Sequence, residues 1–131
     1  YIMIVQKILL VGAGGFIGSI LRYLLAGWSQ ALFKTLVFPF GTFVVNVAGC
    51  LVIGALAGWT DNFQLFSAQA RLFFLMGILG SFTTFSTFGY ETMAMMKNGD
   101  LPFALFNVLT HVVLGTGAAF AGFFIVCRFF E

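Results

Sequence analysis

The residues with the clearest chemical potential lie together at positions 77–88, inside an apolar stretch. This segment reads Gly-Ile-Leu-Gly-Ser-Phe-Thr-Thr-Phe-Ser-Thr-Phe and holds five hydroxyl side chains and two glycines. Hydroxyl side chains compete with the helical backbone for hydrogen bonds, and glycine weakens a helix further. The pattern therefore predicts a break in a helix. Carbonyl groups that are freed at such a break are able to bind a small cation.

The same segment carries three phenylalanines, Phe82, Phe85 and Phe88, which are spaced by three residues. On a helix they form a slowly drifting stripe. An aromatic ring has a positive edge, so ring edges and hydroxyl groups together offer an anion partial positive charges without a fixed cation. Ordinary packing or lipid contact is the alternative for a chain with 19 Phe, and both interpretations stay open from spacing alone.

Composition places these residues in a membrane protein. Of the 131 residues, 61% are hydrophobic and only 8% are charged, and the mean hydropathy is +1.08. Soluble domains carry about 25% charged residues. The net charge of +2 is spread out without a basic cluster, which excludes nucleic acid as a partner. The two cysteines, Cys50 and Cys127, lie in apolar runs without metal-ligand spacing.

The hydrophobic pattern predicts an all-α integral membrane protein with a single domain over residues 1–131. A spanning helix needs about 20 mostly apolar residues, and four stretches qualify, at about 4–28, 41–60, 71–96 and 102–129. The third helix is then broken in mid-membrane, where non-helical backbone must be buried in protein or line a cavity. Small-residue pairs predict close helix packing, at Gly14 with Gly18 and at Gly54 with Gly58.

Basic residues do not favour one orientation of these helices in the membrane. They divide nearly evenly between the two sides, with Lys7, Arg71 and Arg128 against Lys34 and Lys97, and with Arg22 inside the first span. Orientation is normally set by an excess of Lys and Arg in cytoplasmic loops. We therefore expect insertion both ways and an antiparallel, dual-topology homodimer in the lipid bilayer. A fixed orientation that is set by other factors is the alternative.

Three motifs resemble those of one known family. Residues 83–88, preceded by Gly80, resemble the signature of the Fluc (CrcB) family of fluoride ion channels. Residues 14–23 are similar to the family's first-helix glycine run, which ends in Arg and an aromatic residue. Residues 41–49 are similar to its second-helix motif with a central Asn. The motifs occur in order and together cover nearly the whole chain.

The resemblance implies a dimer with two antiparallel fluoride pores in the plasma membrane or bacterial inner membrane. Passive fluoride export would give resistance to fluoride toxicity. It also implies a structural sodium ion at the dimer centre, held by backbone carbonyls of Gly80 and Thr83 from each subunit. The implied pore residues of the first three helices, with the hydroxyls beside them, are Phe85, Phe88, Asn46, Ser86 and Thr87.

The fourth span adds Asn107 and His111, which share one helix face at i and i+4. Members of the family carry a polar track on that face, and we predict both residues to line the pore. The chain departs from the family at the next turn, where Gly115 replaces the usual serine. Thr116 is a possible substitute, although it lies about 100° around the helix. For His111, a structural hydrogen-bonded role is the alternative.

Two charged residues complete the predicted site. Arg22 lies further inside its predicted span than the other basic residues do, and such residues mark function or a buried partner. We expect Arg22 to stabilise the anion near its entry, unless its head reaches the interface instead. Glu91 lies one turn past the phenylalanine stripe and matches a family Glu near the end of the pore.

Other functions agree less well with the sequence. A small proton-coupled multidrug-type exporter is the main alternative, and its mechanism needs a carboxylate within the membrane. The acidic residues, Asp61, Glu91, Asp100 and Glu131, avoid the middle of the predicted spans. A non-transporting assembly subunit would leave the hydroxyl-rich segment unexplained. An enzyme is not expected, because no nucleophile and base or metal set is present in the sequence.

Overall fold

The computed structural model describes residues 2–34, 37–63 and 67–129, and every regular element in these ranges is helical. Three long helices are α1 (Ile2–Phe33), α2 (Phe40–Phe63) and α6 (Leu101–Phe129). The segment between α2 and α6 consists of α3 (Ala68–Arg71), the π-helix η1 (Leu72–Leu79), α4 (Gly80–Phe82) and α5 (Phe85–Lys97). Four stretches are long and apolar enough to cross a membrane, which confirms the predicted all-α fold with four spans.

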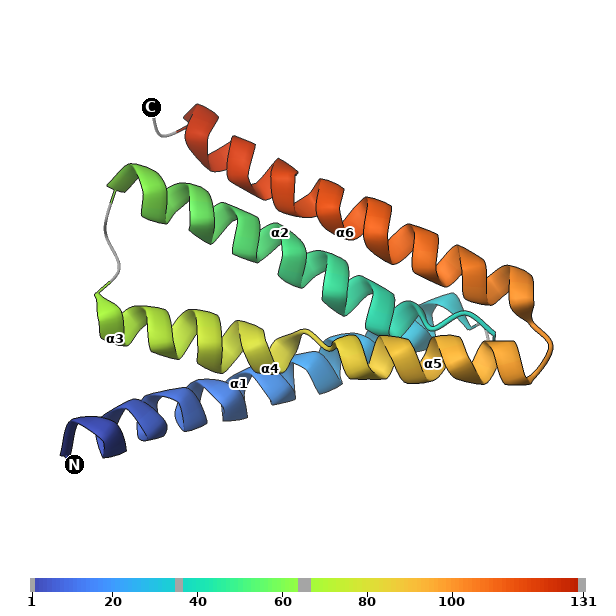
Figure 1. Cartoon of the computed structure of the whole chain (residues 1–131), viewed down its shortest axis with the longest axis horizontal. Helices are drawn as coiled ribbons and strands as arrows, with labels where there is room; N and C mark the ends of the chain where they lie inside the picture. The colour runs from blue at the N-terminus through green and yellow to red at the C-terminus, as the bar shows by residue number, and fades with distance from the viewer. Residues whose placement is uncertain (1, 35–36, 64–66, 130–131) are drawn as a thin grey trace.

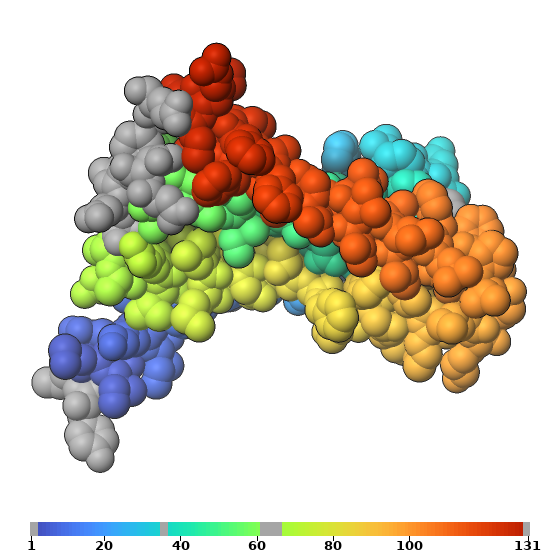
Figure 2. All heavy atoms as spheres, turned by 45° about the horizontal axis from the view of Figure 1, so that its top comes forward, coloured from blue at the N-terminus to red at the C-terminus, as the bar shows by residue number. Residues whose placement is uncertain are grey.

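Two pairs of spans make up the arrangement. α2 runs along α6, whereas α1 packs against η1 and α4 (Figure 1). The elements from α3 to α5 follow one another along a single line, and α1 crosses behind them. Figure 2 shows α6 and α5 side by side on one face, with the N-terminal end of α1 projecting from one end of the molecule.

Glycines allow these helices to approach closely. A Cβ atom added at Gly14 would lie 2.9 Å from the Cα atom of Gly77 in η1, and one at Gly54 would lie 2.9 Å from the Cα atom of Ala119 in α6. Such distances leave no space for a side chain. The structure thus confirms close packing at both predicted glycine pairs.

The helices are longer than the sequence analysis predicts. α1 continues past Trp28 to Phe33, and no glycine or proline follows before Lys34. In this added stretch the hydroxyl of Ser29 donates to the carbonyl of Leu25 at 2.7 Å. The helix ends where Lys34 adopts a φ of 46°. The third span begins earlier than predicted, at Ala68, because Ser67 caps it by accepting a hydrogen bond from the Ala70 N–H at 3.2 Å.

Much of the surface of the described chain is apolar. Phe16 is 69% exposed and Leu109 is 62% exposed, whereas the buried apolar side chains are few: Phe38, Val45, Leu79, Met95, Ala104 and Val126. Apolar faces of this extent require lipid or another protein chain to cover them. The fold is therefore that of a multi-pass membrane protein.

Candidate functional site

The third span is interrupted within its hydroxyl-rich segment. α4 ends at Phe82 and α5 begins at Phe85, and Thr83 and Thr84 between them have extended backbones, with φ and ψ of −82° and 154° and of −149° and 113°. The Thr84 hydroxyl accepts a hydrogen bond from the Thr87 N–H at 3.2 Å. This contact caps the start of α5. The hydroxyl of Thr83 donates to the carbonyl of Leu79 at 3.0 Å.

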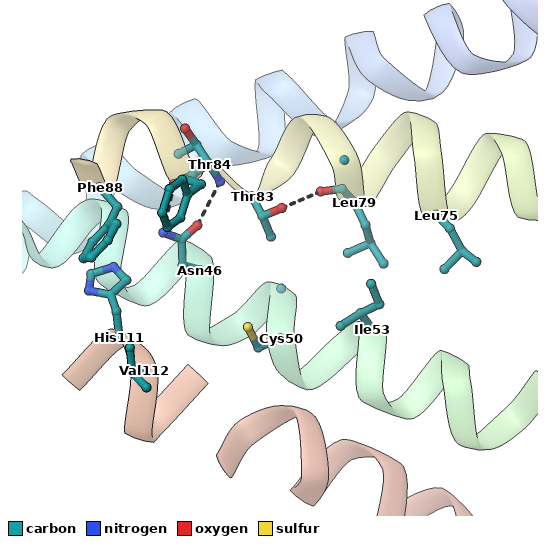
Figure 3. Close-up of a pocket in the computed structure, with 13 residues that line it drawn as sticks. Asn46, Cys50, Ile53, Leu75, Leu79, Thr83, Thr84, Phe88, His111 and Val112 are labelled. Carbon is teal, nitrogen blue, oxygen red and sulfur yellow. Dashed lines mark hydrogen bonds between the residues drawn. The ribbon is translucent and has the colours of Figure 1, made fainter. Parts of the chain in front are cut away.

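Asn46 of α2 holds the interruption in place from the neighbouring helix. Its Nδ2 donates to the Thr84 carbonyl at 3.1 Å, and its Oδ1 accepts from the Thr84 N–H at 2.9 Å (Figure 3). Backbone groups away from water require such partners. Both polar groups of Asn46 are therefore engaged with Thr84, and its predicted contact with fluoride stays a prediction.

The interruption also removes two helical donors. In a continuous helix the N–H of Thr84 would donate to the carbonyl of Gly80, and that of Thr87 to the carbonyl of Thr83. Here Thr84 donates to Asn46 and Thr87 donates to the Thr84 hydroxyl. The carbonyls of Gly80 and Thr83, which the family resemblance implies as cation ligands, thus lose their helical partners. Backbone carbonyl oxygens at a helix break are suitable ligands for a small hard cation such as sodium.

An open cavity of about 410 Å³ lies beside the interruption, between α2, the third span and α6. Six of the predicted site residues line it: Asn46, Gly80, Thr83, Phe85, Phe88 and His111. Its other walls are largely apolar and include Cys50 and Ile53 of α2 and Leu75 of η1 (Figure 3). Residues from three separate spans therefore meet around one space.

Aromatic rings form one end of this cavity. Phe85 is 83% exposed, and its ring centroid lies 5.5 Å from that of Phe88. The imidazole of His111 contacts two rings, with centroid distances of 4.5 Å to Phe88 and 5.4 Å to Phe43. The contact with Phe43 is edge-on, at an interplanar angle of 78°. These contacts fix the orientation of the His111 ring.

Asn107 lies behind the cavity wall and is fully buried. Its Nδ2 donates to the hydroxyl of Thr92 at 2.9 Å, and that hydroxyl donates to the carbonyl of Phe88 at 2.7 Å. The backbone carbonyl of Asn107 lies 2.9 Å from Nδ1 of His111. Asn107 therefore connects α6 to α5 and is not among the described residues that line the cavity.

Glu91 lines a second cavity of about 390 Å³ together with Gln30, Tyr90 and Asn98. Its Oε1 accepts a hydrogen bond from the hydroxyl of Thr42 in α2 at 2.7 Å. The sequence analysis missed Thr42 and Thr92 as polar partners in the bundle. Thr42 lies within the second-helix motif at residues 41–49, so its presence there was the available signal.

The other predicted residues lie outside the first cavity. Ser86 is exposed, and its hydroxyl lies 3.3 Å from that of Thr84, whereas the Thr87 hydroxyl accepts from Thr84 at 2.9 Å. Arg22 is half-buried on α1 and lines neither of the two cavities. A Cβ atom at Gly115 would lie 3.5 Å from Sγ of Cys50. Cys50 therefore lies next to the position where members of the family usually have a serine.

Comparison with known proteins gives a consistent result. Residues 9–123 match the family described as CrcB-like protein, Camphor Resistance (CrcB). The chain is 43% identical to Fluoride-specific ion channel FluC 3 of Methanosarcina barkeri, over 88% of this chain and 86% of that relative. It is also 43% identical to Fluoride-specific ion channel FluC of Elusimicrobium minutum, over 92% and 93% of the two chains. The protein of the same name from Leptospira interrogans is 42% identical, over 95% and 97%.

Proposed function

The chain belongs to the CrcB-like family, and on that premise we propose that it is a fluoride-selective ion channel. Fluoride would leave the cell passively through it, which would protect the cell from this toxic anion. The relatives are named as ion channels rather than enzymes, and the chain is accordingly not an enzyme.

One observation carries this proposal: the exposed ring of Phe85 stands beside a cavity whose described lining contains no charged Lys or Arg side chain. A narrow pore has to replace the water around an ion by groups that bind it without trapping it. The positive ring edges of Phe85 and Phe88 are weak partners of this kind. A lysine or arginine in the same place would hold the anion more tightly.

We place a second, oppositely oriented copy of the chain against this cavity. The cavity is not fully enclosed, apolar faces of the chain are exposed, and basic residues favour neither orientation. A cysteine introduced in loop 97–100, in a variant without Cys50 and Cys127, tests the arrangement in intact cells. About half the copies should be labelled from outside, and labelling of all or none would overturn the dual topology.

We also propose a structural sodium ion at the centre of this dimer. The carbonyls of Gly80 and Thr83, whose helical donors are engaged elsewhere, support the proposal. Two copies of the chain would together present four such oxygens, which suits a hard cation. When bound, the ion would supply a positive charge that attracts the carbonyl oxygens of both subunits and so links the interrupted segments of the two third spans. Replacing sodium by a large organic cation should slow fluoride flux, and unchanged flux would argue against the ion.

Liposomes that contain only the purified protein test the function itself. With potassium inside and valinomycin present, fluoride efflux that is measured with a fluoride electrode should exceed that of protein-free liposomes. Chloride efflux under the same conditions should stay near the background. Absence of fluoride efflux, or equal efflux of both anions, would contradict a fluoride-selective channel.

A proton-coupled exporter is the second candidate because of Glu91. This residue lies within the third apolar span, is half-buried, and has a buried Oε2 atom without a hydrogen-bond partner among the described residues. Proton-coupled export requires a carboxylate within the membrane, and Glu91 lies inside this span but near its end. Uptake of an organic cation that is driven by a pH gradient and abolished by Glu91→Gln would support the exporter. Fluoride efflux without any pH gradient would support the channel instead.

A further inference from the structure

The hydrogen bonds of His111 define which of its nitrogens carries a proton. Nδ1 lies 2.9 Å from the carbonyl oxygen of Asn107. A carbonyl oxygen only accepts, so Nδ1 is the donor. A neutral imidazole has one N–H group. Nε2 is therefore unprotonated and carries a lone pair.

That lone pair belongs to a residue in the wall of the cavity. Nε2 is buried and has no hydrogen-bond partner in the described part of the chain, and His111 lines the same cavity as Phe85 and Phe88. The rings of Phe43 and Phe88 both contact the imidazole. Rotation to find another partner for Nε2 would break these contacts and the bond to Asn107.

We propose that His111 is a proton-dependent fluoride contact, which binds the anion through Nε2 only after Nε2 has taken up a proton. This rests on the proposed fluoride channel and names a specificity-determining residue within it. A lone pair repels a nearby anion, whereas a protonated ring presents an N–H donor with a positive charge. Hydrogen bonds that involve an ionised donor are about twice as strong as neutral ones.

Two of the titratable groups on the elements that surround His111 need separate controls. Cys50 of α2 lines the same cavity, and Glu91 lies on α5, one turn after Phe88, where Thr42 holds it. On α6 itself the neighbour of the ring is the neutral Asn107. Any test of proton dependence must therefore separate His111 from Cys50 and Glu91.

Coupling between proton and fluoride is reciprocal. If protonation strengthens fluoride binding by about tenfold, which corresponds to ~1.4 kcal/mol, then fluoride must strengthen proton binding by the same factor. The effect is therefore observable on the ring itself as well as in ion flow.

The chain has one histidine, which makes the ring directly observable. Nitrogen NMR of ¹⁵N-histidine-labelled protein in nanodiscs should show the Nδ1–H form at high pH. Sodium fluoride should increase the protonated fraction at a fixed pH relative to the same concentration of sodium chloride. Equal titration curves in the two salts would overturn the proposal.

Fluoride currents across planar bilayers give the second readout, since leakage of neutral HF through lipid carries no charge. In the wild-type protein, the fluoride concentration for half-maximal current should fall by about tenfold as His111 becomes protonated. His111→Asn and His111→Gln present an amide donor at every pH, so this dependence should disappear. Cys50→Ser and Glu91→Gln should retain it.

The possible failures are distinguishable. Fluoride currents that are present but have the same pH dependence in wild type and both His111 variants would overturn the role of His111 alone. A pH dependence that disappears in Glu91→Gln would overturn it as well. Absence of fluoride current from every protein would overturn the channel, and the NMR titration would still decide whether the ring binds fluoride.

Discussion

Replacing Asn46 by leucine tests whether this side chain maintains the interruption of the third span. Leucine has a similar size but lacks both the donor and the acceptor that pair with Thr84. The N–H and carbonyl of Thr84 would then have no partner in the neighbouring helix. We expect the interruption to open more often and the bundle to lose stability.

The size of the effect follows from the two hydrogen bonds. Side-chain hydrogen bonds between membrane helices contribute about 0.6 kcal/mol on average and up to about 1.7 kcal/mol. Loss of both bonds should therefore reduce the free energy of unfolding by about 1–3 kcal/mol. This range corresponds to a change of about 5- to 150-fold in an equilibrium constant.

Hydrogen exchange at the Thr84 amide, measured in nanodiscs, reports the change at the site itself. Its exchange rate should rise by a factor in that range in Asn46→Leu. Asn46→Asp retains the acceptor for the Thr84 N–H but directs an oxygen at the Thr84 carbonyl. The Asp variant should therefore lose stability while the Thr84 amide stays protected.

Ser19→Ala is the matched control for a polar side chain in a span. The Ser19 hydroxyl donates only to carbonyls of its own helix, those of Gly15 at 2.8 Å and Phe16 at 3.1 Å. Its removal should leave Thr84 exchange unchanged. If Asn46→Leu also leaves that exchange unchanged, Asn46 does not hold the interruption and the reasoning is wrong.

Two further predictions concern the aromatic rings and the glycine crossings. Phe85→Ile and Phe88→Ile keep bulk but remove the ring edge, which contributes about 0.5–1.5 kcal/mol, so fluoride flux from liposomes should slow by up to about tenfold. Phe82→Ile changes a ring outside the cavity and should conduct nearly normally. Equal flux in all three variants would mean that the three phenylalanines serve only in packing. Gly14→Val forces a side chain into the adjacent helix and should lower the thermal unfolding temperature by several degrees. Gly15→Ala, where a Cβ atom meets nothing within 4 Å, should leave it almost unchanged.

The sequence predicts the spans well because their signal is local. Length and hydropathy identify four apolar helices without any knowledge of their neighbours. The helix ends were less predictable, because Trp28 is typical of a membrane interface but does not stop a helix. Five more residues join α1 before Lys34 ends it.

The site depends on contacts that no local pattern contains. The π-helix at Leu72–Leu79 is an unbroken apolar run, and its altered hydrogen bonding has no marker in residue type. The hydroxyl cluster pointed to the right segment, but the use of Asn46 on the Thr84 backbone depends on how α2 packs. The pairing of Thr42 with Glu91 likewise joins residues 49 positions apart.

The bond between Asn46 and Thr84 has a consequence for the order of synthesis. The two residues are separated by 38 positions, and the ribosome makes Asn46 first. Because chains emerge from the N-terminal end, α2 is complete before residues 83 and 84 leave the ribosome. The partner for their backbone groups is then already present when the third span enters the lipid. A circular permutant that begins after α2 reverses this order, so its third span would meet the bilayer before Asn46 has been made.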